Sequence, residues 1–312
     1  MKIKRKILIT GGTGFIGSHL VNYLIKKGYE KKLIVIDNLS NSRKKNIPKN
    51  IKFIKIDCSN SKSLKKINKY KFETIFHIAA SSSGENSFYE TEEDMMNNLM
   101  ATLNLLKIAK KQKTKKFIFT STMSVYGDPK KLPVDENTIK APKSFYAIHK
   151  SASEEYIKIF SSYGISSFIL RLFNVYGPGQ NLDNDKQGML KIYLTQMIKD
   201  KKLIIKGSLK RFRDFVYVDD VIRALFNCMK KNSKFLILNI GSGKKITVQQ
   251  LVSLSNKNLK SNIKPKVLKS TPGDQFGIYG NIKKANKKIN WKPKIDINIG
   301  IKKFINYIKK NV

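Results

Sequence analysis

Six short apolar runs, separated by segments of helical period, constrain the fold of this chain more than any other feature. Within each run the apolar residues are nearly continuous rather than alternating with polar ones, which is typical of strands covered on both faces. The runs are Lys6–Ile9, Leu33–Ile36, Ile51–Ile56, Thr74–Ile78, Phe117–Thr120 and Ser167–Leu170, and the predicted helices between them are Ile16–Lys27, Asp94–Lys111 and Ser144–Ser161. This order predicts an α/β fold with a doubly wound parallel sheet of the Rossmann type.

The pattern changes after Arg171. Loops are expected around Gly177 and Gly207, followed by shorter elements and a final helix near Ile299–Ile308. A chain of 312 residues is long enough for two domains. We therefore predict a Rossmann domain at residues 1–172 and a smaller mixed α/β substrate domain at 173–312, from which some segments return to the sheet.

The charge of the chain is extreme, with a formal net charge of +40 and a pI near 10.1. Only six of the 62 basic residues are arginine, and the lysines are scattered over predicted helix surfaces and loops. We interpret them as a solvated coat and expect no specific nucleic-acid partner. No apolar run reaches membrane-spanning length, so no membrane partner is expected. Cys58 and Cys228 are far apart and show no metal-ligand or disulfide spacing, which predicts no metal site and a cytoplasmic protein.

A glycine-rich turn, Thr10-Gly-Gly-Thr-Gly-Phe-Ile-Gly17, follows the first predicted strand and opens the first helix. Gly11 would permit the tight turn, Gly14 would let the backbone approach a pyrophosphate, and Gly17 would let the helix pack closely. The N-terminus of the helix would then face the phosphates. The turn predicts a dinucleotide site.

Asp37 ends the second predicted strand, 20 residues after Gly17. A carboxylate there can accept both hydroxyls of the adenosine ribose and would repel a 2′-phosphate, which favours NAD over NADP. Arg43 lies nearby in the sequence, and an arginine there could accommodate a 2′-phosphate, which would favour NADP. Asp57, after the third strand, could meet the adenine amino group or simply cap the next helix.

The fourth strand ends in His77-Ile-Ala-Ala80, whose small residues leave room for a dinucleotide. His77 is expected to be packed rather than catalytic.

Tyr146 and Lys150 are four residues apart on a predicted helix, so they share one face of it. A lysine ammonium beneath a phenol would stabilise the phenolate, and a tyrosine that titrates near ~10 could then act as a base near neutral pH. In a lysine-rich chain this spacing also arises by chance, and a surface tyrosine over a lysine stem is the alternative.

Together these motifs resemble the extended short-chain dehydrogenase/reductase family, and within it the nucleotide-sugar epimerases of the UDP-glucose 4-epimerase type. The resemblance runs nearly end to end. Besides the residues above, it includes Asn97-Asn98-Leu99, the Thr122 segment, Arg171-Leu-Phe-Asn174, Arg213-Asp214-Phe215 and Pro272-Gly273-Asp274.

The resemblance implies a role for each matching residue. Tyr146 would be the base, Lys150 would bind the nicotinamide ribose and lower the pKa of Tyr146, and Thr122 would hydrogen-bond the reacting hydroxyl. The expected cofactor-binding residues are Gly11, Gly14, Phe15, Ile16, Gly17, Asp37, Asn38, Asp57, Cys58, Ala79, Ala80, Asn98, Tyr146 and Lys150, and the expected substrate-binding residues are Ser124, Asn174, Arg213 and Asp274.

Asn174 and Arg213 would grip a nucleotide diphosphate, for which a guanidinium offers paired donors. A surface salt bridge of Arg213 with Asp214 or Asp219 is the alternative.

Two positions favour one reaction within the family. The 4,6-dehydratases carry an Asp-Glu pair after the Thr122 position, and the decarboxylases place a Glu at the second of these positions; this chain has Met123 and Ser124. The resemblance therefore implies NAD-dependent epimerisation at C4 of a nucleotide sugar, most simply UDP-glucose or UDP-galactose, through transient oxidation to a 4-keto sugar. A nucleotide-sugar 4-ketoreductase or dehydrogenase is the alternative.

The sequence departs from the family pattern at three places. Thr271 stands where many members have an arginine on the diphosphate, and Lys269 is a possible substitute. Ser82 and Ser83 stand where UDP-glucose 4-epimerases often have a lysine near the cofactor. Ile278, near the expected wall for a C2 N-acetyl group, leaves open the choice between glucose and N-acetylglucosamine. Apolar residues on Met95–Ala109 and Phe145–Phe160 suggest a homodimer, unless both helices simply face the sheet.

Overall fold

A seven-stranded parallel sheet organises the computed structural model, which describes residues 5–184, 187–270 and 275–312. Every adjacent pair of strands in this sheet is parallel. In spatial order the strands are β11 (Phe235–Ile240), β6 (Ser166–Leu172), β5 (Lys116–Thr122), β4 (Phe72–His77), β1 (Lys6–Thr10), β2 (Leu33–Asp37) and β3 (Lys52–Lys55). The strand order reverses between β1 and β4, which is where open α/β sheets bind their ligands.

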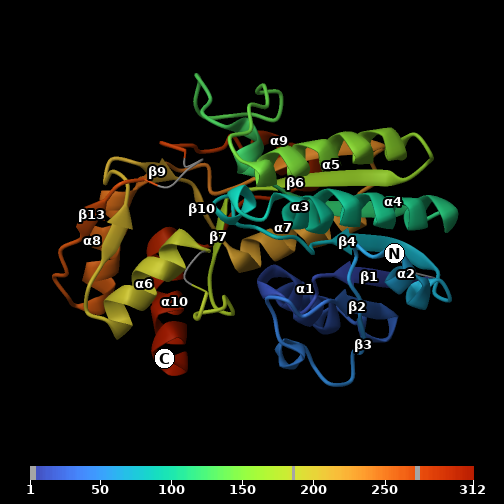
Figure 1. The fold of residues 1–312 in the computed structure, drawn as a ribbon, viewed down its shortest axis with the longest axis horizontal. Helices are drawn as coiled ribbons and strands as arrows, with labels where there is room; N and C mark the ends of the chain where they lie inside the picture. The colour runs from blue at the N-terminus through green and yellow to red at the C-terminus, as the bar shows by residue number, and fades with distance from the viewer. Residues whose placement is uncertain (1–4, 185–186, 271–274) are drawn as a thin grey trace.

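Helices cover both faces of the sheet, as Figure 1 shows. One core joins strand residues such as Ile7 and Ile118 to α1 and α7, and a second joins Leu8 and Phe117 to α4 and α5. The helices are α1 (Phe15–Lys26), α2 (Ser61–Leu64), α3 (Thr91–Met95), α4 (Ala101–Lys111), α5 (Phe145–Ser161), α6 (Met189–Lys199), α7 (Val218–Lys230), α8 (Val248–Leu259), α9 (Lys283–Ile289) and α10 (Ile297–Asn311). The doubly wound α/β fold predicted from the apolar runs is confirmed.

A smaller lobe of mixed structure lies beside the ends of the strands, on the left in Figure 1. Helices α6, α8 and α10 belong to it, together with three two-stranded sheets. These sheets pair β10 (Phe215–Tyr217) with β7 (Asn174–Tyr176), β12 (Ile246–Thr247) with β9 (Phe212–Arg213), and β13 (Lys266–Leu268) with β8 (Ile204–Lys206). The chain leaves the large sheet after β6 and returns to it in α7 and β11. A domain boundary after residue 172 stays a prediction.

The helix expected at Asp94–Lys111 contains a feature that its sequence pattern did not reveal. Between α3 and α4 the residues Met96–Met100 form a turn of π-helix. Such turns interrupt the regular hydrogen-bond ladder and are frequent at functional sites. This one packs against α5, and Asn97 within it lines the cavity described below.

Among the described residues, no helix is both long and apolar enough to cross a membrane. Both cysteines are buried and outside any disulfide. The cytoplasmic location stays a prediction.

Candidate functional site

A cavity of about 1030 Å³ lies along the carboxyl ends of the sheet strands. Its wall begins at the turn after β1, continues past the ends of β2, β3, β4 and β5, and reaches β7, α6 and α10 in the smaller lobe. The predicted site residues on this wall are Gly11, Gly14, Phe15, Ile16, Gly17, Asp37, Asn38, Asp57, Cys58, Ala79, Ala80, Thr122, Tyr146, Lys150 and Asn174. The fold thus brings most of the predicted residues to one cavity.

The glycine turn is shaped by two close approaches. Gly11 has φ of +64°, and a Cβ on it would lie 2.7 Å from the backbone N and Cα of Ala79. A Cβ on Gly17 would lie 2.0 Å from the carbonyl oxygen of Gly11. Any side chain at either position would therefore displace backbone. Gly14 precedes the first residue of α1, whose N-terminus has no side-chain cap, so the first amides of the helix stay available to an anion.

Asp37 is held in place at the end of β2. One oxygen accepts from the amide of Leu39 at 2.9 Å and from the Ser42 hydroxyl at 3.1 Å, and the other accepts from the amide of Thr13 at 3.2 Å. These donors fix the carboxylate at the cavity wall, where a ribose is expected. Arg43 also lines this part of the cavity.

Asp57 closes a turn after β3 and does not cap the next helix, because the N-cap of α2 is Asn60. Its carboxylate accepts from the amide and the hydroxyl of Ser59, at 2.8 and 2.7 Å. Asp57 also lies on the cavity wall, and its contact with adenine stays a prediction.

His77 is packed, as the sequence suggested. Its Nδ1 hydrogen-bonds Thr10 at 2.8 Å and its Nε2 hydrogen-bonds Thr102 at 3.0 Å. Burial holds its pKa well below the usual range. The Thr10 hydroxyl oxygen also accepts from the amides of Ile78 and Ala79, which fixes the end of β4 beneath the cavity.

Asn98 lies in the π-helical turn and is 1% exposed. Its backbone carbonyl accepts from the hydroxyls of Thr102 and Ser153, which ties the turn to α5. Its side-chain oxygen Oδ1 has no hydrogen-bond partner among the residues described. A buried acceptor of this kind indicates a group that the protein binds.

Tyr146, Thr122 and Ser124 form a chain of hydroxyls. The side chains of Tyr146 and Thr122 are hydrogen-bonded. The Thr122 hydroxyl is also 3.1 Å from the Ser124 hydroxyl, to which it can donate, and it accepts from the Ser124 amide at 3.2 Å. Because Thr122 has one hydroxyl proton, it donates to one neighbour at a time.

Lys150 is 1% exposed, and its ammonium lies 4.0 Å from the centre of the Phe119 ring. Burial lowers the pKa of Lys150 to about 7, against the opposing effect of Glu154 and Asp94. Burial raises the pKa of Tyr146 to about 12, and the interaction that opposes this rise is the hydrogen bond with Thr122. Burial thus dominates the pKa shifts of both groups, and a lowering of the Tyr146 pKa by Lys150 stays a prediction.

Two of the predicted substrate-binding residues, Asn174 and Arg213, are hydrogen-bonded to other parts of the protein in this structure. The Asn174 amide nitrogen donates to the Asp214 carbonyl at 3.2 Å and lies 3.6 Å from the Met123 sulfur. Arg213 is buried and is not among the residues that line the cavity. Its guanidinium donates to the carbonyls of Phe212, Gln275 and Phe276, at 2.8, 2.6 and 3.2 Å. A contact of Arg213 with a diphosphate stays a prediction.

The alternative partners of Arg213 are engaged elsewhere. The Asp214 carboxylate accepts from the amides of Gly243 and Gly280, and Asp219 lies 3.8 Å from His19.

The remaining predicted positions lie off the cavity wall or outside the described residues. Asp274 and Thr271 fall in the latter group, and Lys269 is exposed. Ile278 is fully buried in a cluster with Met123, Phe173 and other apolar residues. It supports the wall from behind and does not line the cavity.

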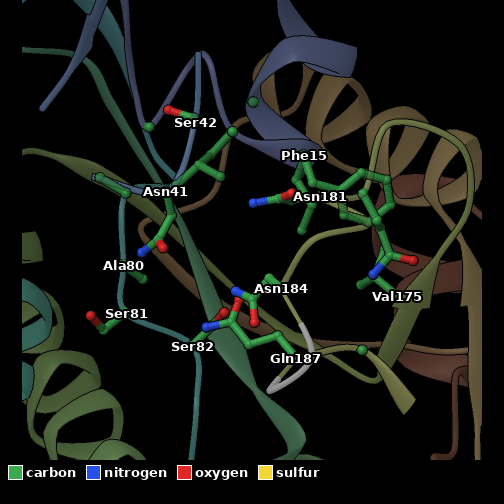
Figure 2. Close-up of a pocket in the computed structure, with 18 of the residues that line it drawn as sticks. Phe15, Asn41, Ser42, Ala80, Ser81, Ser82, Val175, Asn181, Asn184 and Gln187 are labelled. Carbon is green, nitrogen blue, oxygen red and sulfur yellow. The ribbon is translucent and has the colours of Figure 1, made fainter. Parts of the chain in front are cut away.

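Sequence motifs missed a segment that closes one side of the cavity. Residues 179–184 and 187–191 line it, together with Tyr307 and Asn311 of α10. Figure 2 shows Asn184 and Gln187 of this segment facing Ser82, which follows β4. A smaller adjoining pocket shares Ser81, Asn184 and Gln187 with the main cavity. Only the Gly177-Pro-Gly179 loop hinted at an irregular segment here.

The cavity fits NAD. The backbone of Gly11 and Gly14 leaves room for a pyrophosphate, and the Asp37 carboxylate lies where the ribose is expected. Tyr146 and Lys150 line the cavity, whereas Asn98 is buried and is not among the lining residues. Among the described residues there is no cluster of three metal-ligating side chains.

Known proteins resemble this chain along nearly its whole length. A protein named "Putative UDP-glucose 4-epimerase" from Methanocaldococcus jannaschii is 39% identical over 98% of this chain and 99% of its own length. The solved UDP-glucose 4-epimerase of Thermotoga maritima, with UDP-glucose, has a TM-score of 0.94 at 35% identity and covers 98% of this chain and 99% of its own. A UDP-N-acetylglucosamine 4-epimerase from Methanobrevibacter ruminantium, in complex with UDP-N-acetylmuramic acid, has a TM-score of 0.91 at 30% identity and covers 100% of both chains.

Relatives with another reaction also match. A UDP-glucuronic acid decarboxylase of Xenopus tropicalis is 27% identical over 100% of this chain and 74% of its own length. Membership of the family therefore does not by itself identify the reaction. Residues 7–241 match the model of the NAD dependent epimerase/dehydratase family. With the parallel sheet, the glycine turn and the Tyr146–Thr122 pair in place, this chain belongs to the NAD-dependent epimerase/dehydratase family.

Proposed function

We propose that this protein is a UDP-sugar 4-epimerase that interconverts UDP-glucose and UDP-galactose. The observation that carries the proposal is the hydrogen-bonded Tyr146–Thr122 pair on the wall of the cavity, followed by Met123 and Ser124 rather than by acids. Elimination and decarboxylation each need an additional acid or base beside the sugar. Epimerisation at C4 needs one reversible oxidation and one proton carrier.

The NAD that the family uses supplies the chemistry of hydride acceptance and return. Tyr146 carries the proton of the C4 hydroxyl. Its raised pKa keeps the phenol protonated at neutral pH, which suits the return of a proton to the sugar. In the forward direction the phenolate needs stabilisation, and the Thr122 hydroxyl is the donor in place for it.

Other residues orient the reactants. The Asn98 acceptor and the Lys150 side chain would hold the nicotinamide end of NAD, and Asp37 its adenosine ribose. Asn174, Ser124 and Arg213 would bind the nucleotide sugar. For Arg213 to do so, its guanidinium must exchange the carbonyls of Gln275 and Phe276 for phosphate oxygens.

The test is incubation of the purified protein with UDP-glucose, UDP-N-acetylglucosamine or UDP-glucuronate, with NAD but without NADH, followed by separation of the products. We expect UDP-galactose from UDP-glucose, without net change in NADH absorbance. A stoichiometric demand for NADH would favour a 4-ketoreductase of the same family. Absence of a C4 epimer from all three substrates contradicts the proposal.

We also propose that the protein is a homodimer that pairs through the helical segment Met95–Ala109 and α5. Large apolar side chains on these helices remain exposed, among them Met95 at 38%, Ile148 at 46% and Ile159 at 63%. These two segments pack against each other (Figure 1). An apolar face of this kind, pairing across a two-fold axis, would form a four-helix bundle. Light scattering of the wild type and of Ile159→Glu tests this proposal: a monomeric wild type contradicts it.

A further inference from the structure

Ser124 contacts the Thr122 hydroxyl from outside the cavity lining. The described lining of the cavity includes Thr122 and Tyr146 but not Ser124. The Ser124 hydroxyl lies 3.1 Å from the Thr122 hydroxyl, and the Ser124 amide donates to the same Thr122 oxygen at 3.2 Å. Two polar groups of Ser124 therefore meet the residue that is hydrogen-bonded to Tyr146.

The turn that follows β5 holds the Thr122 oxygen in place. Thr122 is the N-cap residue of a 3₁₀ turn, Met123–Tyr126, and its side chain accepts from the amide of Ser124. A threonine side chain is stiff about χ1, so the oxygen stays fixed and only the hydroxyl proton turns. Because Thr122 is 8% exposed and Tyr146 is 9% exposed, water competes little for that proton.

The hydrogen-bonding capacity of one hydroxyl limits how these groups can be arranged. The Thr122 oxygen has one proton to donate and two lone pairs with which to accept. While Tyr146 holds its proton, Thr122 can donate to Ser124 across the 3.1 Å contact. Once Tyr146 is a phenolate it can only accept, so Thr122 must donate to it. Ser124 must then turn its own hydroxyl and donate to Thr122, which fills both acceptor positions of Thr122 together with the Ser124 amide.

We propose that Ser124 is a positioning residue that stabilises the phenolate of Tyr146 through Thr122, by donating a hydrogen bond to the Thr122 oxygen. No proton is transferred in this rearrangement, because the two hydroxyls only rotate and the proton of the C4 hydroxyl still goes to Tyr146. A donor behind Thr122 polarises its O–H group and strengthens the charge-assisted hydrogen bond to the phenolate. The inference rests on the proposed function for the reaction that the phenolate serves, and it is separate from the sugar contact that the resemblance implies for Ser124.

The ionisable groups around Tyr146 belong to other residues, so a substitution at Ser124 leaves them in place. After burial, the charge of Asp94 on α3 adds to the raising of the Tyr146 pKa, and Asp94 is paired with His149 of α5 at 2.7 Å. The ionisable groups in this part of the site are His77, Asp94, Tyr126, His149, Lys150, Glu154 and Arg171. Among the described residues, none of these side chains is hydrogen-bonded to Ser124.

A double-mutant cycle tests the proposal, with kcat and KM for UDP-glucose measured in the NAD-supplied protein between about pH 6 and 10. In Ser124→Ala, kcat should fall roughly threefold to tenfold at pH 7, the worth of one hydrogen bond, while KM stays unchanged. The rise of kcat with pH should be displaced by roughly half to one pH unit toward higher pH. In a Thr122→Val background the same substitution should have no further effect, because Ser124 acts through the Thr122 hydroxyl.

A measurement without sugar separates this inference from the proposed function. Tyrosine labelled at the ring carbon that bears the hydroxyl reports its ionisation by NMR, and the Tyr146 signal is the one lost in Tyr146→Phe. In the NAD-supplied protein this signal should titrate at higher pH in Ser124→Ala than in the wild type. If this difference is found but no C4 epimer forms, the proposed function fails and the Ser124 assignment stands.

Ser161→Ala is the matched control, because Ser161 is a buried serine at the other end of α5, where its hydroxyl donates to the Lys158 carbonyl at 2.6 Å. It should change neither kcat nor the titration of Tyr146. Four results overturn the proposal: equal kcat in Ser124→Ala and the wild type, a loss of kcat that persists in the Thr122→Val background, a rise in KM in place of the fall in kcat, or a Tyr146 signal that titrates alike in both proteins. If Ser124→Ala does not fold, Ser124→Gly, which also lacks the hydroxyl, must meet the same expectations.

Discussion

Replacing Glu154 by Gln should cost more stability than most single substitutions in this protein. Glu154 lies on α5, one turn after Lys150, and is 1% exposed. It accepts from Arg171 Nε at 3.0 Å, from Arg171 Nη2 at 2.7 Å and from the Ser121 hydroxyl at 2.6 Å. It therefore joins α5 to β5 and β6 directly behind the Tyr146–Thr122 pair.

The magnitude follows from these contacts. The glutamine keeps one oxygen, but its amide group would face the guanidinium as donor against donor. At least one charge-assisted hydrogen bond is lost, at about 1.5–3 kcal/mol. Arg171, itself 2% exposed, would remain buried without its carboxylate. Breaking a buried ion pair in this way costs about 3–5 kcal/mol, which is our expected loss in the free energy of unfolding.

Urea denaturation provides the assay, followed both by circular dichroism and by the fluorescence of the single tryptophan, Trp291. Coincident transitions are needed before a two-state free energy is assigned. Glu155→Gln is the matched control, since Glu155 is 56% exposed and pairs with Lys140 at 2.6 Å. It should lose no more than about 1 kcal/mol.

A double variant tests the physical reason. Replacing both Glu154 by Gln and Arg171 by Met removes the uncompensated charge, so it should be more stable than Glu154→Gln alone. The reasoning is refuted if Glu154→Gln loses no more than Glu155→Gln, or if the second substitution adds its full cost to the first.

The remaining predictions concern the reaction site. Tyr146→Phe should retain NAD but lose activity by ~10²–10⁴-fold in the product assay, the worth of a positioned acid–base group, and full activity would remove Tyr146 from its role. Because burial lowers the Lys150 pKa to about 7, well below the usual pKa of a lysine, the unfolded chain binds more protons between these two pKa values, and the contribution of this group to stability rises with pH over that range. Lys150→Met should therefore be more stable than the wild type at pH 7, with an advantage that shrinks toward pH 10 in urea titrations; a difference independent of pH contradicts this. Asp37→Asn should narrow the preference for NAD over NADP in binding titrations, since it removes the charge that repels a 2′-phosphate; an unchanged preference contradicts the assignment.

Local features of the site were predictable because they depend on short stretches of chain. Gly11 and Gly17 leave no space for a Cβ, which is a property of one turn and of the strand beside it. Asp37 ends a strand that is recognisable from its own apolar residues. The π-helical turn at Asn98 was not predictable, because its residues also fit an ordinary helix and the carbonyl it frees is satisfied by Ser153 of α5. Likewise, no motif indicates that β11 returns to pair with β6.

The spacing of Tyr146 and Lys150 could not predict the net direction of their pKa shifts. Four residues on a helix do place the two side chains on one face, but the sign of a pKa shift depends on how much water each group loses. Both are nearly fully buried, and burial dominates both shifts.

The same desolvation cost explains why the sequence alone does not show which lysines of this chain have a function. Composition makes lysine nearly uninformative here, since 56 of them are spread along 312 residues. Burial in the folded structure distinguishes a few lysines from the others, because a folded chain retains a buried ammonium only where strong acceptors or an anion stabilise it. Lys116 meets this condition with backbone carbonyls, whereas Lys150 lies beside Phe119 and lines the cavity, where a bound anion could reach it. We infer that in such strongly biased chains, function is better sought among the few buried lysines than in the net charge.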